Sequence, residues 1–261
     1  EDDDVARRDA ALAFEMGDHL AQEFGAGDGA GPLDAPAFRS ERLAAHGVDL
    51  DADDVAALGK VKTLRIEFTA WDEKGKAMNT TTLTLAGGGY RLQTTADRDR
   101  GYEAAVCAGR LDGRTSTKAD ALARRSVRPV PYEEFKKLRD MARDDLAFFA
   151  LPAPGLGTAT YQGYSEIDGR KTHAVEYAYA SGFRIIRHFA ADTFALVASD
   201  QPTPKGELQR QKVVSSTKAD GISFPAKETV TVDGKKSGDV TYDQIQVNPA
   251  LSAGLFDFPS F

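Results

Sequence analysis

The chain is 261 residues long, with 41% hydrophobic and 28% charged residues and a formal net charge of -7 at pH 7. This composition excludes a mostly disordered chain. The acidic net charge does not suit binding to the phosphates of DNA or RNA, so we expect no nucleic-acid partner. The single cysteine, Cys107, excludes an internal disulfide and a four-cysteine zinc site. The sequence contains no run of 18 apolar residues, so we expect no transmembrane helix.

The N-terminal residues 1–50 are expected to form a helical extension. Apolar residues recur with near-helical spacing over 5–24, and a glycine-rich stretch follows at 25–32. The segment 51–58 has an aspartate cap and predicts a short second helix. The acidic residues 1–4 are the opposite of the basic start of a signal peptide, so either the chain is cytosolic or a leader has been removed.

After residue 59 the pattern changes from helical spacing to alternation. In 64–68 the apolar side chains share one face and the charged side chains share the other, which is typical of a half-buried strand. The segments 81–85 and 90–93 repeat this alternation on either side of a glycine break at 87–89. We expect these strands to form an antiparallel meander.

One strong helix is expected in the later half, over 131–149. Pro131 suits its first position, and Glu133 and Glu134 place negative charge at its N-terminus. From residue 158 onward, turn signals at short intervals separate runs of β-branched and aromatic residues, which predicts hairpins.

These elements predict a mainly β (α+β) fold. We expect a curved antiparallel half-barrel sheet of roughly ten strands, with helices covering the concave face. One domain should span 1–261, with the N-terminal extension at 1–50 and a helix-containing insert or lid at 119–157. Two helices cannot cover so many strands, so either the sheet curls on itself or part of its concave face is left for a ligand.

Signatures of catalysis and of metal binding are weak. The sequence has no HExxH, CxxC, P-loop or GxSxG motif, and the acidic stretch 49–53 lacks the glycine and the final glutamate of a calcium loop. His173 and His188 could lie on neighbouring strands, but no third metal ligand is evident. An enzyme would need these histidines clustered with Glu176 and Arg187 inside a cavity. We therefore expect no catalytic residues, no metal and no cofactor.

Apolar residues form the candidate ligand cavity. Those on the first strands share a concave face, and the 131–149 helix could either close the space as a lid or plug it fully. The expected cavity residues are Leu64, Ile66, Phe68, Leu83, Leu85, Tyr90, Leu92, Tyr132, Phe135, Leu138, Leu146 and Phe149. Before the helix, Arg124, Arg125 and Arg128 form either a solvated basic turn or a contact for anionic head groups.

Four segments resemble the periplasmic lipoprotein carriers LolA and LolB. The segment 58–69, followed by a charged glycine turn, resembles the end of the first helix and the first strand of these carriers. The segment 247–259 resembles their closing segment, and 161–170 and 218–225 are similar to their repeated hairpins. The order of the segments extends the resemblance over roughly residues 50–261.

This resemblance implies a half-open β-barrel, helices that form a lid, and a cavity that shields acyl chains. The implied protein is a non-catalytic periplasmic carrier of a lipid or lipoprotein, working in outer-membrane biogenesis of a Gram-negative cell after removal of its leader. Its partners would be the cargo, an inner-membrane donor and an outer-membrane acceptor, and we expect a monomer. The alternative is an envelope sensor or adaptor that binds a protein partner with the same fold.

Overall fold

The computed structural model describes residues 60–87, 89–96, 102–109, 111–147, 152–203 and 205–257. The helices expected before residue 59 lie outside these residues. The described part of the chain forms one antiparallel sheet of 13 strands and one helix. No helix in these segments is long and apolar enough to cross a membrane.

The strands are named in chain order and are well separated by turns. They are β1 (Thr63–Asp72), β2 (Ala77–Ala86), β3 (Gly89–Ala96), β4 (Tyr102–Ala108), β5 (Gly113–Lys118), β6 (Ser126–Pro129), β7 (Gly157–Ile167), β8 (Arg170–Tyr179), β9 (Arg184–Ala190), β10 (Leu196–Pro202), β11 (Leu208–Ala219), β12 (Ile222–Val232) and β13 (Lys235–Val247). The helix is α4 (Tyr132–Leu146).

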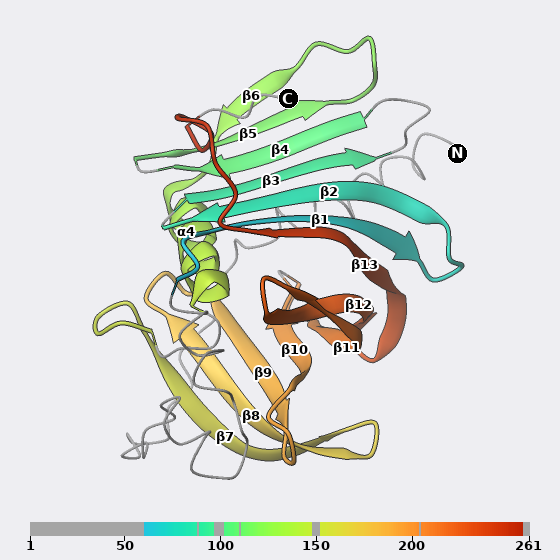
Figure 1. The fold of residues 1–261 in the computed structure, drawn as a ribbon. Coiled ribbons are helices and arrows are strands. Elements are labelled where there is room, and N and C mark those ends of the chain that lie inside the picture. Colours follow the sequence, from blue (N-terminus) through green and yellow to red (C-terminus); the bar gives the residue numbers. More distant parts are fainter. Residues whose placement is uncertain are drawn as a thin grey trace.

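The sheet is a long meander whose first and last strands pair in its middle. Its strand order is β6-β5-β4-β3-β2-β1-β13-β12-β11-β10-β9-β8-β7, so β1 pairs with β13 and the edge strands β6 and β7 remain apart. We call β1 to β6 the first arm and β7 to β13 the second arm. The sheet curves without closing, and α4, which joins the two edge strands in sequence, lies between the arms (Figure 1).

The prediction of a mainly β, curved antiparallel sheet is confirmed, but the strand count of roughly ten is wrong. Among the additional strands, β5 (GRTSTK) and β6 (SVRP) carry no apolar alternation. Such strands pair through their backbones at the sheet edge, and the side-chain pattern gives no sign of them.

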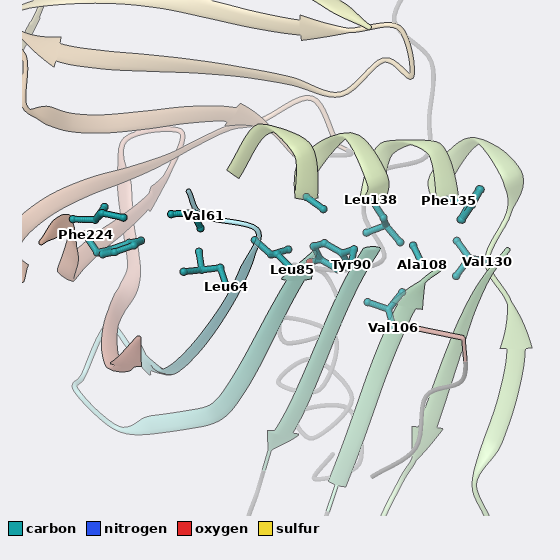
Figure 2. Packing of buried hydrophobic residues seen from close by; sticks show 12 residues of the cluster. Val61, Leu64, Leu85, Tyr90, Val106, Ala108, Val130, Phe135, Leu138 and Phe224 are labelled. Atoms are coloured by element: carbon teal, nitrogen blue, oxygen red, sulfur yellow. The ribbon is translucent and has the colours of Figure 1, made fainter. Parts of the chain in front are cut away.

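α4 packs on one end of the first arm. Pro131 precedes it in an extended conformation, and Phe135, Leu138 and Ala142 are buried against the core formed with β2, β3 and β4. Figure 2 shows Phe135 and Leu138 above Tyr90 and the neighbouring strands. The described helix contacts only part of the sheet, so a cover of the concave face by helices is not confirmed.

A second apolar cluster belongs to the second arm. It includes Tyr177, Phe183 and Ile185. Met141 of α4 packs against both this cluster and the core of the first arm. An unbranched thioether side chain suits such a junction, because it adapts to irregular surfaces.

The C-terminal segment closes over the outer face of β3. The buried guanidinium of Arg91 donates a hydrogen bond to the carbonyl oxygen of Leu255 at 2.8 Å. At Gly89 a Cβ atom would lie 2.9 Å from the ring of Phe256, so this close approach requires glycine. The segment that follows β13 therefore packs against β3.

Candidate functional site

A cavity of about 410 Å³ lies on the concave side of the sheet, between the two arms. Its volume falls within the range of about 300–1,000 Å³ that is usual for ligand pockets. Most of its lining is apolar and comes from β1, β2 and β3 on one side and from β9, β12 and β13 on the other. A curved sheet that does not close thus leaves space for an apolar ligand.

The strand residues that the sequence predicted as cavity residues all border this space. They are Leu64, Ile66, Phe68, Leu83, Leu85, Tyr90 and Leu92. The antiparallel register brings them together, because Leu83 lies opposite both Ile66 on β1 and Leu92 on β3. Their role in holding a ligand remains a prediction.

The predicted helix residues lie elsewhere. Tyr132 is 68% exposed, Phe135 and Leu138 are buried in the core, and Leu146 packs half-buried against the same core. None of these four is among the residues that border the cavity, and Phe149 lies outside the described residues. The apolar stripe of α4 packs the helix onto the sheet and does not line the cavity.

A different face of α4 borders the cavity, and sequence reasoning missed it. Met141, Asp144 and Asp145 are three and four residues apart, so they share one side of the helix. A signal was present, since two aspartates stand in the last helical turn, where the helix dipole disfavours negative charge. A local rule broken in this way is most common at functional or strained sites.

The cavity wall contributed by the second arm was also missed. It includes Phe183, Ile185 and Leu196 near β9 and β10, and Val230 and Val240 on β12 and β13. The alternation of residues 183–187 predicts a strand correctly. It carries no information about which strands face each other across an open sheet.

A buried ion pair joins α4 to the second arm at the cavity. Arg187 donates to both oxygens of Asp144, to Oδ1 at 3.1 Å through Nη1 and to Oδ2 through Nη2. The hydroxyl of Tyr179 also donates to Asp144 Oδ1, at 2.8 Å. Burial disfavours the charge of Arg187, but the ionised Asp144 outweighs this effect and holds the pKa of Arg187 above its ordinary value.

Asp145, next in the chain, is held less firmly. Its Oδ1 lies 3.9 Å from Nη2 of Arg187, and its side chain is 41% exposed where it borders the cavity. Partial burial, and then the negative charge of Asp144, raise the pKa of Asp145 to about 7, with Arg187 opposing them. These surroundings therefore disfavour the ionised form of Asp145 compared with a fully exposed aspartate.

A second carboxyl group borders the cavity from the opposite wall. Glu228 on β12 is buried and accepts a hydrogen bond of 2.6 Å from the hydroxyl of Tyr242 on β13. Burial raises the pKa of Glu228 above its ordinary value, although the bond from Tyr242 opposes the shift. The ring of Tyr242 also packs against Phe68, with 6.0 Å between ring centroids.

The residues considered for an enzyme are not brought together. Arg187 borders the cavity, whereas its neighbour His188 faces the other side of the sheet. His173 and His188 lie on opposite faces of β8 and β9, and Glu176 is on the same outer face as His188. The constellation that an enzyme would require is therefore not formed.

The histidines have partners of other kinds. His188 is buried between Ser165, whose Oγ lies 2.8 Å from Nδ1, and Asp200, whose Oδ2 lies 2.9 Å from Nε2. His173 stacks on Phe194 with 5.3 Å between ring centroids. In the described segments no group of three His, Cys, Asp or Glu side chains could hold a metal ion.

The remaining candidates lie away from the cavity. Cys107 is buried, and burial raises the pKa of its thiol to about 11, with Arg91 opposing the shift. Arg124, Arg125 and Arg128 are exposed around β6, and Arg125 pairs with Glu103 of β4 at 2.5 Å. They do not border the cavity.

Comparisons with known proteins concern the fold. No protein-family model and no curated protein matches the sequence. A DUF1329 family protein from Desulfovibrio piger has a similar structure, with a TM-score of 0.51 and 16% identity over 82% of this chain and 94% of that chain. A LolA superfamily protein from Nitrosomonas europaea gives a TM-score of 0.49 and 10% identity, over 84% of this chain and 98% of that chain. The similarity to the Desulfovibrio piger protein supports the curved antiparallel fold expected from the sequence, and at these identities nothing beyond the fold follows.

Proposed function

We propose that this protein binds a hydrophobic cargo, a lipid or the acyl chains of a lipoprotein, in the cavity between its two arms. The supporting observation is a ligand-sized space with apolar walls from both arms. Each methylene group transferred from water into such a space contributes about 0.8 kcal/mol. Binding of this kind needs no catalytic residues.

The proposed setting is the periplasm of a Gram-negative cell. The four segments that resemble LolA and LolB support it, and they imply an inner-membrane donor and an outer-membrane acceptor for the cargo. A carrier between membranes has to release what it binds, so its cavity has to open.

α4 is the proposed lid of this carrier. It connects the two edge strands in sequence, and its last turn is fixed to β9 by the pair of Asp144 and Arg187. Movement of the helix away from β9 would break this contact and widen the cavity. A covalent cross-link between α4 and β9 should therefore block loading and release, and unchanged loading and release would contradict the lid role.

A neutral fluorescent probe, N-phenylnaphthylamine, tests the cavity directly. The protein should take up the probe, and Leu83→Trp should abolish uptake by filling the space that Leu83 borders. Leu122→Trp is the matched control, because Leu122 is 96% exposed. A wild-type protein that takes up no probe would refute the cargo proposal and favour the envelope adaptor.

A further inference from the structure

The charged groups around the cavity are mostly acidic. Among the described residues that border it, the carboxylates are Asp144, Asp145, Glu207 and Glu228, and the cations are Arg187 and Lys205. Glu207 and Lys205 belong to the turn between β10 and β11, at the rim of the second arm. The inner part of the cavity thus carries three carboxyl groups and one guanidinium.

That guanidinium is already engaged. Arg187 is bound through two nitrogens to Asp144, so it is poorly placed to accept an additional anion. Asp145 approaches the same guanidinium at 3.9 Å, beyond hydrogen-bond distance. Asp145 therefore shares a distant cation with Asp144, and among the described residues that border the cavity the hydrogen-bond partner of Glu228 is the neutral hydroxyl of Tyr242.

The charge of Asp145 does not stabilise the fold. It stands in the last turn of α4, where the helix dipole disfavours an anion, and it adds a second negative charge next to Asp144. Its side chain is not part of the apolar core, its ion pair with Arg187 is long at 3.9 Å and shared with Asp144, and it borders a space large enough for a ligand. A positively charged group in that space would relieve both unfavourable effects.

We infer that the cavity selects apolar ligands with a cationic head group, which lies between Asp145 on α4 and Glu228 on β12 while the hydrocarbon part contacts the apolar walls. This inference rests on the proposed function and names the charge class of its ligand. An anionic amphiphile such as a fatty acid would place its carboxylate among three others and should bind weakly.

The inference also sets a pH dependence. The charged and titratable groups that face Asp145 are Asp144 on α4, Arg187 on β9, Tyr90 on β3 and Tyr242 on β13. The pKa of Asp145 lies at about 7, so the carboxyl group is ionised at pH 8 and protonated at pH 5.5. Affinity for a permanently charged cation should therefore fall as the pH falls, and affinity for a neutral ligand should stay constant.

Displacement of N-phenylnaphthylamine by three dodecyl compounds separates these classes. At pH 8 we expect dodecyltrimethylammonium to bind more tightly than dodecanol, and dodecanoate to bind more weakly than either. Asp145→Asn should weaken the cation about tenfold and leave dodecanol unchanged, since a charge-assisted contact is replaced by a neutral one. Asp112→Asn, an exposed carboxyl group paired with Arg114, is the control and should change nothing.

The outcomes distinguish the two proposals. Probe uptake by Asp145→Asn shows that the variant folds, so a selective loss of cation affinity supports the inference. Uptake with no preference for the cation, or a preference that Asp145→Asn leaves intact, overturns the inference while the cargo proposal stands. A wild-type protein that binds neither probe nor dodecanol overturns both.

Discussion

The buried pair between α4 and the second arm should make a large contribution to stability. Arg187→Leu removes both hydrogen bonds from Arg187 to Asp144 and leaves a buried carboxylate with the hydroxyl of Tyr179 as its remaining side-chain donor. Breaking a buried pair in this way typically costs about 3–5 kcal/mol. Such a loss is a large part of the total stability of a domain, which is about 5–15 kcal/mol.

The measurement is the free energy of unfolding from urea titration, followed by tyrosine fluorescence. Arg184→Leu is the control on the same strand. The side chain of Arg184 is 65% exposed, and its Nη1 lies 3.6 Å from Oε1 of Glu176, so it forms only a surface ion pair. This substitution should change stability by less than about 0.5 kcal/mol. The double variant Asp144→Leu with Arg187→Leu should lose less than the sum of the two single variants, since no charge is left unpaired.

Equal losses for Arg187→Leu and Arg184→Leu would show that the buried pair adds no measurable stability, and that α4 is held to the sheet mainly by its apolar stripe. Strict additivity in the double variant would show that Asp144 and Arg187 contribute independently and not as a pair.

Three further predictions concern other parts of the structure. Gly89→Ala should destabilise the protein by about 1–3 kcal/mol and make the C-terminus more sensitive to carboxypeptidase, because the new Cβ meets the ring of Phe256; unchanged digestion would contradict the contact. Cys107, buried and with a raised pKa, should react with Ellman's reagent at pH 8 only after denaturant is added, and rapid labelling of the native protein would oppose this. The raised pKa of Glu228 means that its ionisation disfavours folding, so Glu228→Gln should raise the free energy of unfolding at pH 8. This gain should shrink as the pH falls through the native pKa towards the ordinary glutamate value, because the carboxyl group of the wild type then becomes neutral. The amide of Gln can still accept the bond from Tyr242, so a gain that does not depend on pH would point to another cause.

The fold class was accessible from the sequence because alternation marks half-buried strands directly. Residues 64–68 and 81–85 show it clearly, and the structure places them in β1 and β2. The polar strands β5 and β6 at one end of the sheet were not accessible, since backbone pairing leaves no apolar pattern. The pairing of β1 with β13 joins residues more than 160 positions apart, and no local rule specifies it.

The candidate site was predictable on one wall only. Leu83 and its neighbours border the cavity because side chains two residues apart share a face of a strand. The same apolar logic failed for α4, where Phe135 and Leu138 pack into the core and the acidic side of the helix faces the cavity. An apolar stripe shows which side of a helix is buried, but it does not distinguish a core from a ligand space.

Mass spectrometry of an organic extract from the gently purified protein shows whether the cavity holds a hydrophobic cargo. We expect an acyl-chain species in near-stoichiometric amount, absent from a denatured and washed control and from Leu83→Trp. A clean extract from a protein that also fails to take up N-phenylnaphthylamine would rule out the proposed cargo binding.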